Sequence, residues 1–216
     1  YKQLKEKDET TLTAYLDALG AVDPEQFQDR AERLAFWINA YNALTIQGIL
    51  HFYPTKSIRD HVSAVKYNIW KDYKMTVNGT AYSLDDIEHK VLRTMDEPRI
   101  HFAIVCASIG CPKLLNEAYT SERLEVQLTR STRDFFANPE KFRIDRGTGT
   151  VHQSPIMDWY KEDFGKDQME RLAFIKPFLT NTEDQAFMDT SGLKVQNLNY
   201  DWNLNDQSRR WAKDTP

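Results

Sequence analysis

The stretch "ERLAFWINAYNALTIQGIL", residues 32–50, constrains the fold of this chain more than any other part of the sequence. Drawn as a helix, it carries apolar side chains on almost every side, and the pattern ends at residues 51–54 with a proline. A helix that is apolar all round is typical of a protein core, whereas a surface helix keeps one polar face. The stretch therefore predicts a central, buried helix in a chain of 216 residues, which is long enough to bury a large core.

The rest of the sequence predicts more helices and a few short strands. Ser83 and Asp86 have the spacing of a capping box, so we expect a helix from Ser83 to about residue 93. Other helices are expected over 1–20, from Asp23-Pro24, over 121–138 and within 155–179. Hairpins are expected at 75–82, around an Asn78-Gly79 turn, and at 142–154, with strands at 100–106 and 193–202.

These elements predict an α+β fold, with a helix-rich N-terminal half packed on a small, mainly antiparallel sheet. We expect a single domain over 1–216, in which 1–29 form an N-terminal helical extension and 206–216 a C-terminal tail. The chain begins at Tyr1 without a methionine, so we expect a trimmed or mature protein, and any signal peptide or lipid anchor would lie upstream of the given sequence.

Composition excludes several classes of function. The net charge is −4 and the basic residues are scattered, so the sequence offers no surface for nucleic acid. No window approaches 18 consecutive apolar residues, so we expect no membrane span. Two cysteines are too few for a disulfide-built scaffold or a closed Cys-rich zinc site, and we expect no metal or cofactor.

A carboxylate falls on the apolar face of the helix that follows Ser83. Leu84, Ile87 and Val91 define that face, and Glu88 lies near its middle. A buried carboxylate is costly unless it is paired, so Glu88 either ties down neighbouring groups or belongs to a site, where it would orient a histidine or act as acid or base. His89 lies at the edge of the same face, where it is either a surface residue or reaches a cleft.

Two amides interrupt the apolar helix at 32–50. Asn39 and Asn42 are three residues apart and therefore lie on one side of it. Buried amides need partners, so they either hold a loop in place or line a site. In a site, Asn42 would be the histidine-orienting member of a Cys-His-Asn arrangement.

Both cysteines lie in "RIHFAIVCASIGCPKL", residues 99–114. In a strand over 100–106, His101 and Cys106 face opposite sides about 16 Å apart, so their pairing requires a bend. His89 lies on a different predicted element, so the geometry of this strand does not separate it from Cys106. Cys111 precedes Pro112 and would cap a short helix at 112–116. The C-x4-C spacing lacks the two-residue spacer of thioredoxin sites and zinc ribbons, and a local disulfide remains open for an exported protein.

The ordered motifs "FWINAYNALTI" (36–46), "YPTKSI" (53–58), "YSLDDIEHKVLR" (82–93), 99–114, "MDWYKEDFG" (157–165) and "LNYDWNLN" (198–205) closely resemble the family known as domain of unknown function 547, in its bacterial form. The resemblance covers about residues 30–205. It implies that Cys106, Glu88, His89 and His101 are signature positions and that Cys111 is less essential. It also implies an exported protein, either periplasmic or a lipoprotein.

The main functional hypothesis is a cysteine hydrolase or acyl transferase that acts on a peptide or small molecule. Cys106 would be the nucleophile, His89 or His101 the base, and Glu88 or Asn42 the orienting group, with amides of the 107–110 turn as an oxyanion hole. For such an enzyme we expect a layout like that of papain or transglutaminase.

Two other classes remain open. In a binding or scaffold domain, the signature residues would build a polar core, and Trp202 and Trp211 would contact a partner. In a thiol redox protein, Cys106 and Cys111 would cycle as a pair. The sequence leaves the oligomeric state open.

Overall fold

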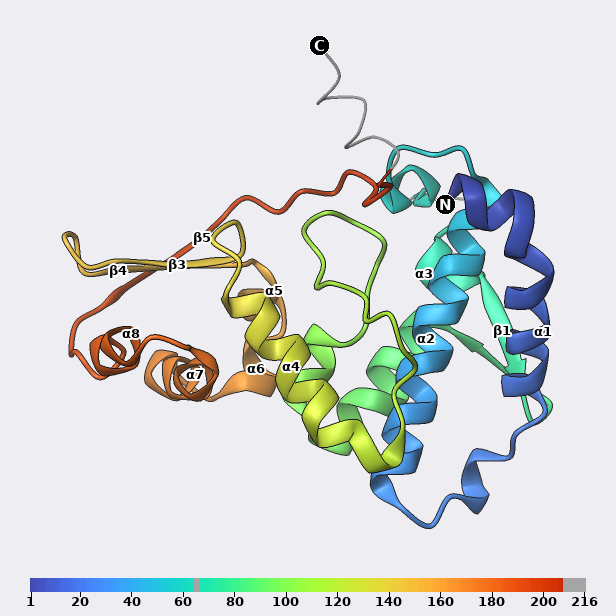
Figure 1. The fold of residues 1–216 in the computed structure, drawn as a ribbon, viewed down its shortest axis with the longest axis horizontal. Coiled ribbons are helices and arrows are strands. Elements are labelled where there is room, and N and C mark those ends of the chain that lie inside the picture. Colours follow the sequence, from blue (N-terminus) through green and yellow to red (C-terminus); the bar gives the residue numbers. More distant parts are fainter. Residues whose placement is uncertain (64–66, 208–216) are drawn as a thin grey trace.

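The computed structural model describes residues 1–63 and 67–207. The predicted central helix is confirmed as α2 (Arg30–Phe52), and most of its residues are buried. Asp29 caps it, because its side chain accepts a hydrogen bond from the amide of Ala31. Helix α1 (Glu9–Gly20) packs along α2, as Figure 1 shows.

Helix α4 is about as long as α1, and the remaining helices, apart from α2, are shorter than both. The α-helices are α3 (Ile69–Asp72), α4 (Leu124–Phe136), α5 (Ile156–Trp159), α6 (Lys161–Phe164), α7 (Gln168–Ile175) and α8 (Thr182–Phe187). Helices of the 3-10 type span Pro24–Gln26, Ile58–His61, Arg93–Met95, Pro98–Phe102, Ser121–Arg123 and Lys176–Phe178. In the part of the chain that the structure describes, Leu4–Asp8 and Asp86–Leu92 are π-helical.

Within the described residues the strands form two small sheets, whereas we expected one. Strands β1 (Lys74–Val77) and β2 (Thr80–Ser83) pair antiparallel. Strands β3 (Phe142–Asp145) and β4 (Thr150–Gln153) also pair antiparallel, and β5 (Lys194–Asn197) joins β4 in parallel. Both predicted hairpins are therefore confirmed, and most of the pairing is antiparallel, as predicted. The strand expected over 193–202 is limited to β5.

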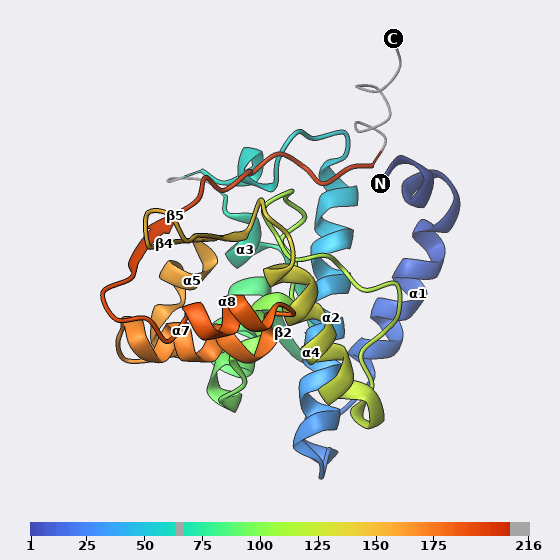
Figure 2. The same ribbon diagram turned by 60° about the vertical axis from the view of Figure 1, so that its left-hand side comes forward.

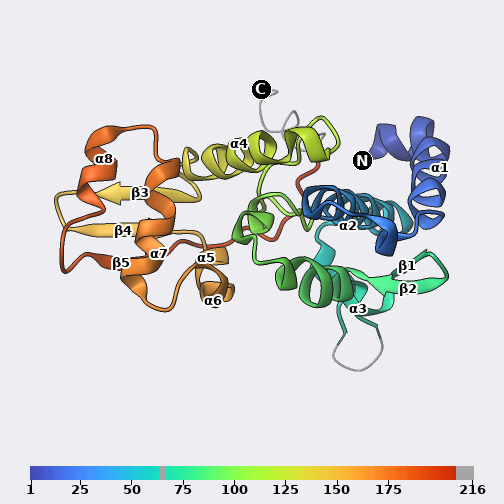
Figure 3. The same ribbon diagram turned by 90° about the horizontal axis from the view of Figure 1, so that it is seen from below.

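The described residues form two large hydrophobic clusters and a smaller one, which consists of Ile49, Ile58, Ile69, Ala107 and Leu204. Around α2, one cluster of buried side chains unites α1, the β1–β2 hairpin and the π-helical segment Asp86–Leu92. A second cluster, centred on Phe102, unites α4, α6 and α7 with the three-stranded sheet. Figures 2 and 3 show the three-stranded sheet and α7 on one side of the molecule and α1 on the other.

The prediction of a strand over 100–106 is wrong. Residues Pro98–Phe102 form a 3-10 helix with Pro98 in its first turn, and Glu97 caps it by accepting a hydrogen bond from the amide of Arg99. The carbonyl of Ile100 then accepts hydrogen bonds from the amides of residues 103 and 104. A short apolar run buried on all sides does not distinguish a strand from a helical turn. The argument that separated His101 from Cys106 therefore fails.

Two further observations concern the described ranges. No helix within residues 1–63 and 67–207 is both long and apolar enough to cross a membrane. The same residues hold no cluster of three or more His, Cys, Asp or Glu side chains placed to bind a metal ion.

Candidate functional site

One pocket, of about 280 Å³, brings together four of the five predicted site residues. Its lining includes Glu88 and His89 from the π-helical segment, His101 from the 3-10 helix, and Cys106 from the loop that follows. Its wall is strongly aromatic, with Trp70, Trp159, Tyr160, Tyr200 and Trp202. The fifth predicted residue, Asn42, is not among the lining residues.

Cys106 and Cys111 form a disulfide at the edge of this pocket. The amide of Cys106 also donates to Sγ of Cys111 over 2.9 Å, and Sγ of Cys106 lies 3.4 Å from the hydroxyls of both Ser108 and Tyr200. Residues 112–116 are not helical, so the expectation that Cys111 caps a helix is wrong. Instead, Cys111 closes the loop on Cys106.

The turn between the cysteines is held by the C-terminal segment. The amide of Ile109 donates to the carbonyl of Asn203 over 2.9 Å, and the amide of Gly110 to that of Asp201 over 2.8 Å. Position 110 requires glycine because a Cβ there would lie 2.8 Å from the ring of Tyr200. Two of the four amides expected to form an oxyanion hole are therefore already bonded.

His101 is buried and held by an acidic partner. Its Nε2 lies 2.7 Å from Oδ2 of Asp163, and its ring stacks on Tyr160 with 4.0 Å between centroids. Arg93 donates to both oxygens of Asp163 at 2.7 Å. Burial would raise the pKa of Asp163, but the bonds from His101 and Arg93 outweigh it and hold that pKa well below its usual range. The ionised carboxylate requires Nε2 to donate, so a neutral His101 has its lone pair on Nδ1.

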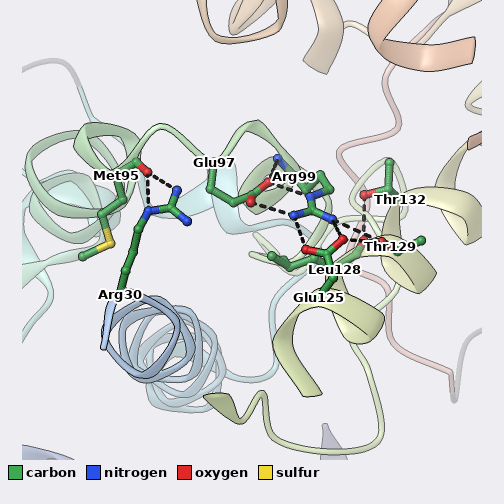
Figure 4. A network of polar contacts seen from close by, with 8 residues as sticks. All are labelled: Arg30, Met95, Glu97, Arg99, Glu125, Leu128, Thr129 and Thr132. Carbon is green, nitrogen blue, oxygen red and sulfur yellow. Dashed lines mark hydrogen bonds and ion pairs between the residues drawn. The ribbon is translucent and has the colours of Figure 1, made fainter. Parts of the chain in front are cut away.

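Ion pairs anchor the 3-10 helix that carries His101. Arg99 donates to both oxygens of Glu97 and to both oxygens of Glu125 on α4 (Figure 4), at distances of 2.6 to 2.8 Å. On the other side, Arg30 of α2 donates to the carbonyl of Met95. Bidentate arginine contacts fix orientation as well as position. The 3-10 helix that carries His101 is therefore tied to α4, and the segment before it, at Met95, is tied to α2.

Glu88 is only 6% exposed and has an incomplete set of partners. Its Oε2 accepts a hydrogen bond from Tyr41 over 3.1 Å, whereas Oε1 is buried with no hydrogen-bond partner among the described residues. Burial, and then the charge of Glu88, raise the pKa values of Tyr41 and Tyr160, so both remain neutral hydroxyls. Burial likewise raises the pKa of Tyr200 to about 12.

His89 lies at the rim of the pocket, with its side chain 39% exposed. Its Nδ1 is 3.1 Å from a guanidinium nitrogen of Arg93, and its Nε2 is 3.9 Å from Asp85. Across residues 1–63 and 67–207, no hydrogen bond joins Cys106 to His89 or to His101. Of the two histidines, His101 is the buried one, and its Nε2 lies 2.7 Å from the carboxylate of Asp163.

Asn42 holds the segment that leads into Cys106. Its amide donates to the carbonyl of Ala103 over 3.0 Å and accepts from the amide of Val105 over 2.9 Å. Asn39 makes the same pair of bonds with the backbone of Tyr119. Both amides therefore act as the loop-holding alternative predicts, and among the described residues neither forms a hydrogen bond with a histidine.

Comparison with known proteins supports the resemblance stated above. The sequence profile described as "Protein of unknown function, DUF547" matches residues 24–136, which is more than half of the chain. The chain belongs to the DUF547 family. The match includes the cysteines and the His101 segment but ends before Asp163 and Tyr200, so it is shorter than the 30–205 expected. No curated protein and no solved structure matches, so the papain-like layout stays a prediction.

Several residues of this DUF547 site were not predicted from the sequence. Asp163 and Tyr160 lie in "MDWYKEDFG" and Tyr200 in "LNYDWNLN", motifs that carried the resemblance without an assigned role. Trp202, expected as an exposed partner contact, packs against Trp70 and Tyr200 in the pocket wall. Trp211 lies outside the described residues.

Proposed function

We propose that this DUF547 protein is a cysteine-dependent hydrolase or acyl transferase, with Cys106 as nucleophile and His101 as general base. One observation carries the proposal: His101, a buried histidine oriented by the carboxylate of Asp163, lines the same pocket as Cys106. A histidine with one nitrogen bonded to a carboxylate and the other unprotonated is prepared to accept a thiol proton.

In the proposed reaction, His101 takes the proton of the Cys106 thiol while the thiolate attacks the carbonyl carbon of an acyl substrate. The tetrahedral oxyanion collapses, the bond to the leaving group breaks, and His101 returns its proton to that group. Water or an amine then attacks the thioester, and Cys106 is released. The neutral hydroxyl of Tyr200, 3.4 Å from Sγ of Cys106, is a donor suited to the oxyanion.

The disulfide makes the proposed activity depend on reduction. An external dithiol would reduce the bond, becoming a disulfide itself while Cys106 and Cys111 each gain a proton. An exported protein, as the sequence predicts, would be active only in a compartment that supplies such a reductant.

Turnover of activated acyl substrates tests the proposal. A panel of p-nitrophenyl esters and peptide thioesters is incubated with wild-type protein and with Cys106→Ala and Cys111→Ala variants, each with and without dithiothreitol. We expect turnover by the wild type only with reductant, by Cys111→Ala under both conditions, and by Cys106→Ala under neither. Equal turnover by Cys106→Ala and wild type would reject Cys106 as nucleophile.

The disulfide itself favours a second candidate, thiol–disulfide exchange with a substrate bound in the pocket, because both cysteines line it. The Cys111→Ala variant separates the two functions. It would lose a redox cycle that needs both thiols, whereas it would keep acyl transfer.

A further inference from the structure

The unsatisfied oxygen of Glu88 points to what the pocket binds. Glu88 lines the pocket and is more than nine-tenths buried, yet Oε1 has no hydrogen-bond partner among the described residues. A buried carboxylate oxygen without a donor is costly, and such exceptions in a folded protein call for an explanation. A ligand that donates to Oε1 supplies one.

The protein groups around Glu88 do not neutralise it. Tyr41 donates to Oε2, and the hydroxyl of Tyr160 also interacts with Glu88, but burial and the charge of Glu88 raise the pKa of both hydroxyls, so both are neutral. The nearby guanidinium of Arg93 is already engaged with both oxygens of Asp163. Hence Glu88 is not paired with a cation of the protein within the described residues.

A second acidic group lies at the rim, where Asp85 also lines the pocket. The basic groups there are His89, which contacts Asp85 and Arg93, and Lys71, which is exposed. The carboxylates of Glu88 and Asp85 favour a cationic ligand, and the aromatic wall suits the apolar carbons attached to the charged group of that ligand.

We propose that Glu88 binds a protonated primary amine of the substrate. The amine would donate one proton to Oε1, while its carbon chain packs on the aromatic wall. Placing this amine in the acyl-transfer reaction rests on the function proposed above. The amine would belong either to the acyl donor, as a free peptide amino terminus, or to a lysine side chain.

Equilibrium binding to the disulfide-bonded protein tests this without any chemistry at Cys106. Alaninamide provides an α-amine, Nα-acetyl-lysinamide an ε-amine, and N-acetylalaninamide the neutral control, with binding followed by calorimetry and by tryptophan fluorescence. In the wild type we expect one of the two amines to bind at least about tenfold more tightly than the neutral amide. Which amine binds identifies the source.

Glu88→Gln keeps the acceptor for Tyr41 but removes the charge, and Asp85→Asn is the matched control at the rim. We expect Glu88→Gln to abolish the preference for the amine, and Asp85→Asn to preserve most of it. Equal affinity of the amines and the neutral amide for the folded wild type would overturn the proposal, as would an undiminished preference in folded Glu88→Gln. Because turnover is not measured, amine binding without acyl transfer would reject only the function proposed above.

Discussion

Asp163→Asn is expected to lower the free energy of unfolding at pH 7 by about 2 to 3 kcal/mol. The carboxylate accepts two hydrogen bonds from Arg93 and one from the buried His101. An asparagine is uncharged and offers one acceptor oxygen, so it leaves Arg93 and His101 with fewer partners. Urea unfolding followed by circular dichroism measures the loss, and Asp158→Asn, on an exposed acid nearby, is the control.

The same substitution is expected to change how stability depends on pH. Because the folded-state pKa of Asp163 is held below its unfolded value, its contribution is present above about pH 4 and is lost as pH falls further. The wild type should therefore lose more stability than Asp163→Asn between pH 5 and pH 3. Parallel pH profiles for the two proteins would contradict the assigned ion pair.

Asn42→Ala is expected to cost about 3 kcal/mol, because it leaves the carbonyl of Ala103 and the amide of Val105 buried without partners. Asn39→Ala removes an equivalent pair of bonds at Tyr119 and should destabilise the protein to a similar extent. The two variants differ in location, since only Asn42 holds the segment that leads into Cys106.

Alkylation of reduced protein separates these effects under conditions where both variants are folded. We expect Asn42→Ala to change the rate at which iodoacetamide modifies Cys106, and Asn39→Ala to leave it unchanged. If both variants alter the rate equally, Asn42 has no specific part in positioning Cys106.

The sequence predicts well those features that neighbouring residues decide. The all-round apolar pattern located α2, and the Asn78-Gly79 turn located the β1–β2 hairpin. The capping box is present, since Ser83 and Asp86 exchange hydrogen bonds through backbone and side chains. The prediction that Glu88 lies on an apolar helix face is also confirmed, because the residue is buried.

The failures concern tertiary contacts. The strand predicted over 100–106 is absent from the described residues, and Pro98–Phe102 form a 3-10 helix instead. A short apolar run that is buried on every side is compatible with either structure. The partner of His101, Asp163, lies 62 residues away in a motif without a periodic signal. The backbone partners of Asn42 and the hydroxyl partner of Glu88 are likewise set by packing between distant segments, which one sequence does not reveal.

The rate of Cys106 alkylation near pH 6.5 tests the central claim most directly. In a Cys111→Ala background Cys106 is the one thiol in the chain, and an ordinary thiol, with a pKa of about 8.5, is almost entirely protonated at that pH. Iodoacetamide modification is followed by mass spectrometry in that protein and with His101→Gln or His89→Ala added.

We expect rapid modification that His101→Gln slows by at least about tenfold, because general-base assistance typically contributes a factor of about 10² or more. His89→Ala should leave the rate nearly unchanged. A rate equal to that of a model thiol, and insensitive to His101→Gln, would contradict the pairing of Cys106 with His101.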